Sequence, residues 1–396
     1  MYKPHFLFKS RFYIGTHASG DRPSIYLCEA DFKEGSFTTI HTMQGISDPT
    51  YLTIGSGDTL YALGRTSDSG RVCALKRESA QSPEGLTALN ARSSGGTGPC
   101  HISVDERGEF LLCANYASGS VSLYDLNSDG RILSLCDFRQ YSGVGFDSED
   151  RQRGPHAHYA AFYSKSCGAP CSAASDPDQL DARDEVLVCD LGLDMVYVYE
   201  LDRTARKLRD TDRSIRLPDG TGPRHLTFSK EHPGMLFVLT EMANTIFTYK
   251  YDPDRCKYVL VQRISAVEEA SLEEALMVPP TADHGSIGCA IRFTNDGRYL
   301  FVSSRLGYQS ISSFRCDTDG SLTFADRCLC GGITPRDFNV FESEEAGSDS
   351  SGSVFLLVAN QDSDLITALQ FDRHSEKLSL LDMKMQAEKP TCILPV

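Results

Sequence analysis

The chain has 396 residues, which is long enough for one large hydrophobic core or for two or three separate domains. Its 54 acidic residues outnumber its 39 basic ones, and a formal charge of −15 argues against general binding to nucleic acid or to an anionic membrane. No segment approaches about 18 consecutive apolar residues, and residues 1–11 contain no long apolar run, so we expect neither a membrane-spanning helix nor a signal peptide.

Seven short apolar runs recur along the chain, and each ends in a polar residue that is followed by a loop. Most copies lie about 50 residues apart, a period that is typical of repeats built from strands. Because equivalent positions of such repeats meet around one axis, we expect the terminal side chains to form a polar ring at one mouth of the molecule. In chain order these residues are His17, Arg65, Asn115, Asp190, Glu241, Arg305 and Asn360.

The repeats predict an all-β fold, a seven-bladed β-propeller with four antiparallel strands in each blade. They run through most of the chain, which favours a single domain over residues 1–396. The first repeat lacks its N-terminal part, so we expect the N-terminal and C-terminal strands to share one blade and to close the ring. Three long intervals predict surface inserts without a function of their own, near 163–184, 266–286 and 342–353.

A second set of polar residues stands where the first strand of a repeat begins. Antiparallel neighbours bring the start of one strand beside the end of the next, so this set and the polar ring should face the same mouth. Several histidines, carboxylates and arginines would then line one concave site, the usual form of a ligand pocket. The residues that we predict at matching positions are His101, His158, His225 and Asp337, with Arg224 and Arg336 one position earlier.

Glu241 is the first candidate for acid–base chemistry in this site. It follows the apolar run Leu236–Thr240, so its carboxylate should lie at the edge of a buried strand. Burial there would raise the pKa of the carboxyl group towards the range of a general base. The alternative interpretation is a structural pair between Glu241 and a nearby arginine.

The other polar residues of the site suggest an anionic ligand. Arg224, Arg305 and Arg336 are suited to bidentate binding of phosphate or carboxylate groups. His156 and His158 show a spacing that metals accept, but no third ligand is fixed by spacing, and we predict no metal site. The full predicted substrate-binding set is Arg224, Arg305, His101, His156, His225, Arg336, Asp190 and Asn115.

The 14 cysteines show no pairing at zinc-site spacing, and several lie inside apolar runs. We find no glycine-rich phosphate loop and no nucleophile elbow, and we predict no cofactor. Reduced thiols and the missing signal peptide favour a cytoplasmic protein. The sequence leaves the oligomeric state open.

Five short motifs together resemble the bacterial-type 6-phosphogluconolactonase family, the seven-bladed propeller lactonases. The order and spacing of these motifs match over nearly the whole chain. They are Tyr13-Ile-Gly-Thr16, Arg151-Gln152 with Gly154-Pro-His-Ala-His158, Gly222-Pro-Arg-His225, Leu239-Thr-Glu241 and Ser303-Ser-Arg305.

The resemblance implies hydrolysis of a small anionic lactone, either a phosphosugar or a carboxylate, and 6-phosphogluconolactone is the first expectation. In the related cycloisomerase of 3-carboxy-cis,cis-muconate, a histidine and a glutamate form the proposed acid–base pair, and two arginines hold the substrate. Carried over by motif, the pair is His158 and Glu241, and the arginines are Arg224 and Arg305. Three alternatives remain: a cycloisomerase, a non-catalytic binding platform, and a metal-dependent lactonase of the regucalcin type.

Overall fold

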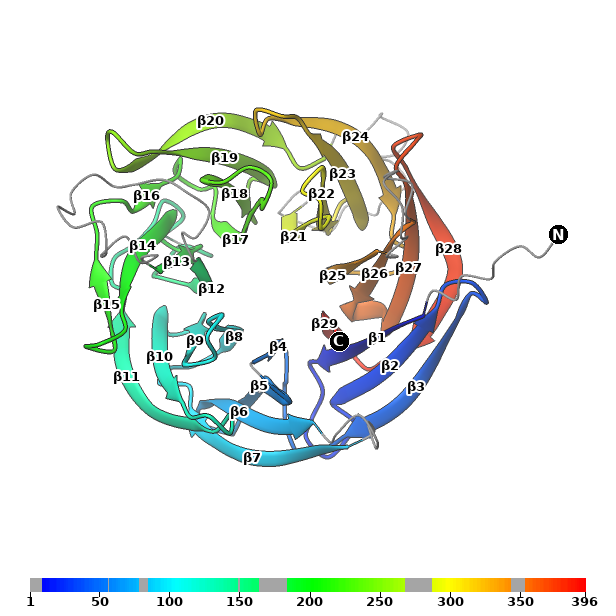
Figure 1. Cartoon of the computed structure of the whole chain (residues 1–396), viewed down its shortest axis with the longest axis horizontal. Helices are drawn as coiled ribbons and strands as arrows, with labels where there is room; N and C mark the ends of the chain where they lie inside the picture. The colour runs from blue at the N-terminus through cyan, green and yellow to red at the C-terminus, as the bar shows by residue number, and fades with distance from the viewer. Residues whose placement is uncertain are drawn as a thin grey trace.

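The computed structural model describes residues 9–55, 57–77, 85–148, 150–163, 184–267, 287–342 and 353–396. Seven antiparallel sheets stand as blades around a central axis, as Figure 1 shows. The predicted seven-bladed β-propeller with four-stranded blades is therefore confirmed. The predicted inserts near 163–184, 266–286 and 342–353 lie almost entirely outside the described residues.

Within each blade the strands run in chain order from the axis to the rim, except that the first blade takes its innermost strand from the C-terminus. Blade 1 contains β29 (Pro390–Pro395), β1 (Lys9–Thr16), β2 (Ile25–Asp31) and β3 (Ser36–Met43). Blade 2 contains β4 (Leu52–Ile54), β5 (Thr59–Arg65), β6 (Gly70–Arg77) and β7 (Leu86–Ser93). Blade 3 contains β8 (Pro99–Val104), β9 (Phe110–Asn115), β10 (Ser120–Leu126) and β11 (Ile132–Gln140).

The remaining four blades follow the same plan, and the fourth has one additional short strand that pairs with β14. Blade 4 contains β12 (Ala157–Tyr163), β13 (Glu185–Asp190), β14 (Met195–Asp202), β15 (Lys207–Asp210) and β16 (Ile215–Arg216). Blade 5 contains β17 (Pro223–Phe228), β18 (Met235–Thr240), β19 (Thr245–Asp252) and β20 (Lys257–Ser265). Blade 6 contains β21 (Ile287–Phe293), β22 (Tyr299–Arg305), β23 (Ser310–Cys316) and β24 (Leu322–Leu329). Blade 7 contains β25 (Pro335–Glu342), β26 (Val354–Asn360), β27 (Leu365–Asp372) and β28 (Lys377–Gln386), with a short 3₁₀ helix (Gln361–Ser363) after β26.

The ring closes between the two ends of the chain, as the incomplete first repeat predicts. Strand β29 pairs antiparallel with β1, and Phe12 faces Pro395 in this register. The inner edge of β1 is therefore covered, which removes an edge that would otherwise be open to aggregation.

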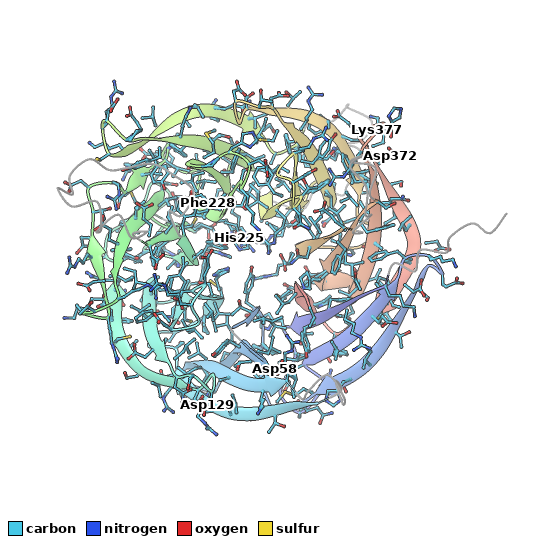
Figure 2. All side chains as sticks on the ribbon, in the orientation of Figure 1. Asp58, Asp129, His225, Phe228, Asp372 and Lys377 are labelled. Carbon is cyan, nitrogen blue, oxygen red and sulfur yellow. The ribbon has the colours of Figure 1, made fainter. Side chains whose placement is uncertain are left out.

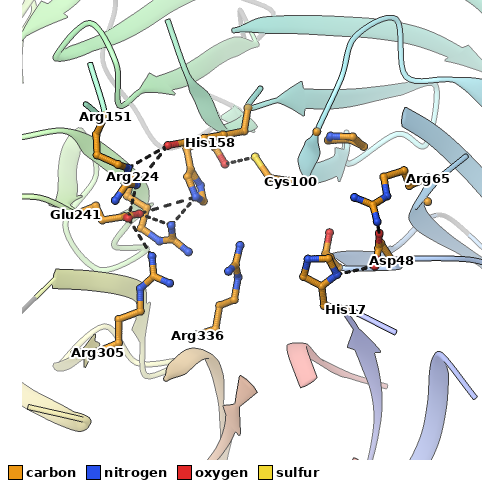
Figure 3. A pocket seen from close by; sticks show the side chains of 15 residues that line it. His17, Asp48, Arg65, Cys100, Arg151, His158, Arg224, Glu241, Arg305 and Arg336 are labelled. Carbon is orange, nitrogen blue, oxygen red and sulfur yellow. Dashed lines mark hydrogen bonds and ion pairs between the residues drawn. The ribbon is translucent and has the colours of Figure 1, made fainter. Parts of the chain in front are cut away.

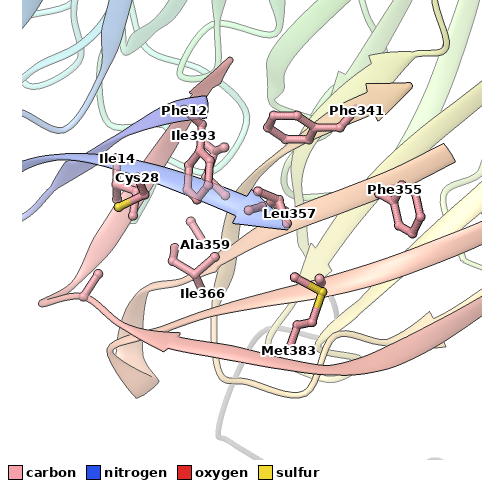
Figure 4. Close-up of a cluster of buried hydrophobic side chains, with 13 residues drawn as sticks. Phe12, Ile14, Cys28, Phe341, Phe355, Leu357, Ala359, Ile366, Met383 and Ile393 are labelled. Carbon is pink, nitrogen blue, oxygen red and sulfur yellow. The ribbon is translucent and has the colours of Figure 1, made fainter. Parts of the chain in front are cut away.

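The hydrophobic core consists of clusters that each lie between two neighbouring blades. Figure 4 shows the cluster that joins blade 7 to blade 1, in which Phe12, Ile14 and Leu357 pack together. Figure 2 shows side chains filling the spaces between blades, with His225 near the axis.

The second strand of a blade has neighbours on both faces, and every residue of β9 and of β18 is buried. This double burial explains why these strands read as continuous apolar runs in the sequence instead of as an alternating pattern.

Candidate active site

A cavity of about 340 Å³ opens at one mouth of the propeller and contains most of the predicted chemistry (Figure 3). It is lined by residues from several blades, so its shape depends on ring closure. The lining residues are His17, Asp48, Thr50, Gly64, Arg65, Gly98, Pro99, Cys100, Tyr116, Arg151, His158, Arg224, Glu241, Arg305 and Arg336.

Four of these side chains are aimed by the same local device, an irregularity in the innermost strand. In β8, Pro99 pairs with Asn115 and His101 pairs with Ala114, so one residue between them has no partner in the register. Strands β12, β17 and β25 shift at the same place. Such bulges bend a strand and re-aim a side chain, and they are common beside active sites. The unmatched residues are Cys100, His158, Arg224 and Arg336, and all four line the cavity.

These bulges correct the predicted alignment of the strand starts. His158 is equivalent to Arg224 and Arg336, and the residue that matches His101, His225 and Asp337 is Tyr159. The one-residue error arose because an unpaired residue changes the face on which the following side chains lie.

The residues that follow the bulges form a buried layer outside the main cavity. His101 is packed between Tyr51 and Tyr159, with ring centroids 4.3 and 3.9 Å away. His225 and Asp337 line a second cavity of about 10 Å³, which has room for about one water molecule. The predicted substrate-binding positions of His101 and His225 are therefore not part of the main cavity's lining.

Glu241 is the centre of a cluster of ion pairs. It immediately follows β18, is 0% exposed, and its Oε1 accepts from Arg151 Nη2 at 2.6 Å and from Arg305 Nη2 at 2.9 Å. Its Oε2 accepts from Arg224 Nη1, and Arg224 Nε donates to the carbonyl oxygen of Cys289 at 2.8 Å. One carboxylate thus holds three guanidinium groups in fixed positions, as the dashed lines in Figure 3 show.

The expectation of a raised pKa for Glu241 is wrong in sign. Burial does act to raise the pKa of this carboxyl group, but attraction from Arg224, Arg305 and Arg151 outweighs burial and holds the pKa well below its usual value. The carboxylate is ionised throughout the physiological range, and its oxygens already accept three charged hydrogen bonds. Of the two interpretations given for Glu241, the structural pair with arginine therefore describes the geometry better than the general base does.

His158 is neutral in this environment. Burial, and then the positive charge of Arg224, lower the pKa of the imidazole well below its usual value. Arg224 also donates a hydrogen bond to Nε2, so the lone pair of that nitrogen is occupied and the proton of the neutral ring is on Nδ1. Among the described residues, Nδ1 has no hydrogen-bond partner although it is buried.

Arg336 provides the least compensated positive charge of the cavity. Its Nη1 donates to Gln361 Oε1 at 3.0 Å, and no carboxylate among the described residues pairs with its guanidinium. Burial, together with repulsion from Arg224 and Arg305, lowers the pKa of Arg336 to about 10, which still leaves the group charged at neutral pH. An anion bound here would relieve that repulsion.

Arg151 and Tyr116 were not among the predicted site residues. Arg151 donates to the Tyr116 hydroxyl at 3.3 Å as well as to Glu241. The Tyr116 ring stacks on the ring of His156, with 4.4 Å between centroids, and His156 Nδ1 donates to the Tyr116 carbonyl oxygen at 2.9 Å. His156 therefore supports the cavity wall from behind. The motif around His158 already contains Arg151, which was the available signal.

Part of the predicted polar ring does not reach the cavity. Asn115 and Asn360 are both 0% exposed, and their amides donate to nearby backbone carbonyl and hydroxyl oxygens. Asp190 Oδ1 accepts from the backbone N–H groups of His156, Gly192 and Leu193. These side chains hold the turns of the mouth, because buried backbone N–H and C=O groups at strand ends need partners.

The opposite wall of the cavity is built by blades 1 and 2. His17 Nδ1 lies 2.5 Å from Asp48 Oδ1, and Arg65 Nη2 lies 2.7 Å from Asp48 Oδ2. His17 and Arg65 were predicted in the polar ring without a chemical role, and Asp48, which begins a weak copy of the repeat, was not predicted as a site residue.

No three His, Cys, Asp or Glu side chains among the described residues are grouped so that they could hold a metal ion. No helix in the described part of the chain is long and apolar enough to cross a membrane.

Comparison with known proteins agrees with this architecture. A family model described as "Lactonase, 7-bladed beta-propeller" matches residues 11–395. The 6-phosphogluconolactonase of Bacillus subtilis (strain 168) is 29% identical over 383 residues, which cover 96% of this chain and 97% of that protein. A crystal structure of a protein from Lactobacillus plantarum has a TM-score of 0.77 and 27% identity, covering 98% of this chain and 100% of that one. The periplasmic gluconolactonase PpgL of Pseudomonas aeruginosa has the same fold, with a TM-score of 0.77 at 22% identity, and the match covers 98% of this chain and 99% of that one. The chain therefore belongs to the seven-bladed β-propeller lactonase family.

Proposed function

We propose that the cavity hydrolyses a small lactone that carries an anionic group, with 6-phosphogluconolactone as the preferred substrate, and that it needs no metal ion. One observation carries this proposal: Arg151, Arg224, Arg305 and Arg336 line one cavity, and Glu241 is the only carboxylate that pairs with them there in the described structure. The surplus of positive charge suits an anion. The name of the Bacillus relative supports hydrolysis of a phosphosugar lactone rather than cycloisomerisation.

The arginines would serve two purposes in the reaction. Arg336 is the group with most to gain from an anion, so we assign to it the phosphate of the substrate. Arg305 and Arg151 both donate to Oε1 of Glu241 and are part-exposed, with side chains 16% and 29% exposed. Placed beside the lactone carbonyl, they would stabilise the negative charge that develops on its oxygen when water attacks.

We assign to Glu241 and His158 the positioning of this cluster. Glu241 holds three guanidinium groups and His158 receives Arg224, so the pair keeps the donors in place before substrate arrives. Preorganised donors of this kind lower the barrier because little reorganisation is needed during the reaction.

The direct experiment is to follow the opening of freshly prepared lactones with and without the protein, in the presence and absence of EDTA. We expect 6-phosphogluconolactone to open faster than unphosphorylated gluconolactone, and EDTA to have no effect. Loss of activity in EDTA would indicate the metal-dependent alternative. Turnover of the lactone of 3-carboxy-cis,cis-muconate instead of the sugar lactones would indicate the cycloisomerase.

Replacing Arg336 with alanine should raise KM for 6-phosphogluconolactone about 10- to 100-fold, because a charge-assisted hydrogen bond contributes about 1.5–3 kcal/mol. Steady-state kinetics with phosphorylated and unphosphorylated gluconolactone measure the effect, and only the phosphorylated substrate should be affected. Arg336→Lys is the matched variant. It keeps the charge but loses the planar fork, so its KM for 6-phosphogluconolactone should lie between that of the wild type and that of Arg336→Ala. Equal changes for both substrates would mean that Arg336 does not bind the phosphate.

We also propose that the protein works in the cytosol on a small molecule. Several cysteines in the described interior, such as Cys28, Cys189 and Cys392, are buried free thiols, which suits a reducing compartment. Labelling of surface thiols in intact cells, compared with lysed cells, would separate this location from the periplasmic location in the name of PpgL.

A further inference from the structure

We infer that His17, held by Asp48, transfers the protons in the lactone opening proposed above. This inference rests on the proposed function and names a group that the family resemblance did not point to. The need for such a group follows from the site itself. Glu241 already accepts hydrogen bonds from three arginines, and Arg224 occupies Nε2 of His158. Three of the about four acceptor positions on the buried Glu241 carboxylate are thus taken by positive charges, and His158 has no unengaged lone pair for a water molecule.

His17 meets the geometric requirements of a general base. Its Nδ1 lies 2.5 Å from Asp48 Oδ1, and because a carboxylate only accepts, the imidazole donates its Nδ1 proton. The lone pair of the neutral ring is therefore on Nε2. No described residue forms a hydrogen bond with Nε2, and the ring lines the same cavity as the arginines. A carboxylate that orients an imidazole in this way also stabilises the charged form after proton uptake.

The backbone at Asp48 has a left-handed conformation that recurs at the mouth of the propeller. Asp48 has a φ angle of +54°, in the left-handed region. It directly precedes Pro49, and the residues at the same place before the inner-strand prolines of blades 3, 5, 7 and 1 also have positive φ: they are Gly98 (φ +61°), Gly222 (φ +63°), Thr334 (φ +58°) and Lys389 (φ +40°). An aspartate in this conformation costs on the order of 1 kcal/mol that glycine would not. The conformation is therefore shared by several blades, and what distinguishes blade 2 is that its residue at this place is a carboxylate.

The rest of the wall fixes the carboxylate at the cavity. The backbone N–H of Asp48 donates to the Ala18 carbonyl oxygen at 2.9 Å, which ties the loop of blade 2 to the residue next to His17. Arg65 pairs with the second carboxylate oxygen at 2.7 Å. Asp48 is mostly buried, with its side chain 12% exposed, whereas the His17 side chain is 41% exposed and accessible to solvent water.

The step balances without a co-reactant. Nε2 of His17 takes a proton from water while the water oxygen bonds to the lactone carbonyl carbon, giving a tetrahedral oxyanion beside the arginines. The bond between that carbon and the ring oxygen then breaks, and Nε2 returns the proton to the ring oxygen as it becomes a hydroxyl group. The carboxylic acid product releases its own proton to solvent.

Replacing His17 with alanine should lower kcat about 10²-fold and change KM little, since general acid–base catalysis contributes about 10²- to 10⁴-fold. Added imidazole should restore part of the lost rate, because the side chain is exposed at the mouth. A structural role would not show such rescue. His374→Ala, at an exposed position between β27 and β28, is the control and should retain the wild-type rate with or without imidazole.

Asp48→Gly separates catalysis from folding. It removes the carboxylate and the backbone strain together, so the free energy of unfolding should stay within about 1 kcal/mol of wild type while kcat falls. Nitrogen-15 NMR of the imidazole should show Nδ1 protonated and Nε2 unprotonated for the resonance that disappears in His17→Ala. The opposite tautomer would overturn the inference whatever the rates are.

The outcomes distinguish the two proposals. Wild-type kcat in His17→Ala, with an active parent protein, overturns the role of His17 and leaves the proposed function standing. A low kcat that imidazole does not restore also overturns the role of His17. If the parent protein opens none of the lactones, the proposed function fails, and the role of His17 in that reaction fails with it.

Discussion

Replacing Glu241 with glutamine should lower kcat/KM for 6-phosphogluconolactone about 10²-fold or more, and the free energy of unfolding by about 3–5 kcal/mol. The glutamine side chain has nearly the same shape but no charge. Arg151, Arg224 and Arg305 would then lose their shared counter-ion in a cavity that already contains the charge of Arg336. Urea denaturation and steady-state kinetics measure the two effects.

A positioning role for Glu241 has a signature that ordinary destabilisation lacks. Inorganic phosphate should raise the melting temperature of Glu241→Gln more than that of the wild-type protein, because the anion would replace the missing carboxylate among the arginines. The control is Glu388→Gln, which breaks the surface pair with Arg22 (2.9 Å, with side chains 31% and 62% exposed) and should change stability by less than about 1 kcal/mol. Wild-type stability and rate in Glu241→Gln would contradict this description of the site.

The protein should lose stability steeply as the pH falls below 6.5, because three histidines are buried in neutral form. His101, His158 and His225 are 3%, 5% and 3% exposed. Burial is the leading cause in each case: it lowers the pKa of His101 to about 3 and the pKa values of the other two well below 6.5. Below pH 6.5 the unfolded chain binds protons that the folded protein does not, so stability rises with pH and falls on acidification.

Each such histidine should cost about 1.4 kcal/mol by pH 5.5, or about 4 kcal/mol for the three together. Asp190 acts in the opposite direction, because burial raises the pKa of its carboxyl group to about 6, and the folded protein binds that proton first. Urea denaturation at pH 7.5, 6.5 and 5.5 gives the net slope.

The contribution of one histidine is obtained as a difference. His101→Phe keeps a ring between Tyr51 and Tyr159 but cannot take up a proton, so between pH 7.5 and 5.5 its stability should decline less than that of the wild type, by about 1.4 kcal/mol in total. His374→Gln, at an exposed position, should leave the wild-type slope unchanged. Identical slopes in His101→Phe and wild type would mean that His101 is protonated in the folded protein.

The amino-acid sequence by itself determined the propeller, its seven blades and the shared closing blade. These features depend on local signals. A strand that is buried on both faces, such as β9 or β18, needs a continuous apolar run, and a run of that kind is visible without coordinates. Ring closure followed from the missing part of the first repeat. The sequence also selected His158, Arg224, Glu241, Arg305 and Arg336, all of which line the cavity.

Only the tertiary structure decided which polar residues face one another and in what charge state. Each of four inner strands contains one unmatched residue. His158 is such a residue, whereas His101 and His225 each follow one, and a sequence pattern does not reveal this difference. The pKa of Glu241 falls instead of rising because arginines from blades 5 and 6 and from the segment before blade 4 converge on it. Asp48, which precedes β4 of blade 2, likewise contacts His17, which follows β1 of blade 1. Electrostatic interaction depends on distance in space, and the positions of these groups along the chain carry almost no information about that distance.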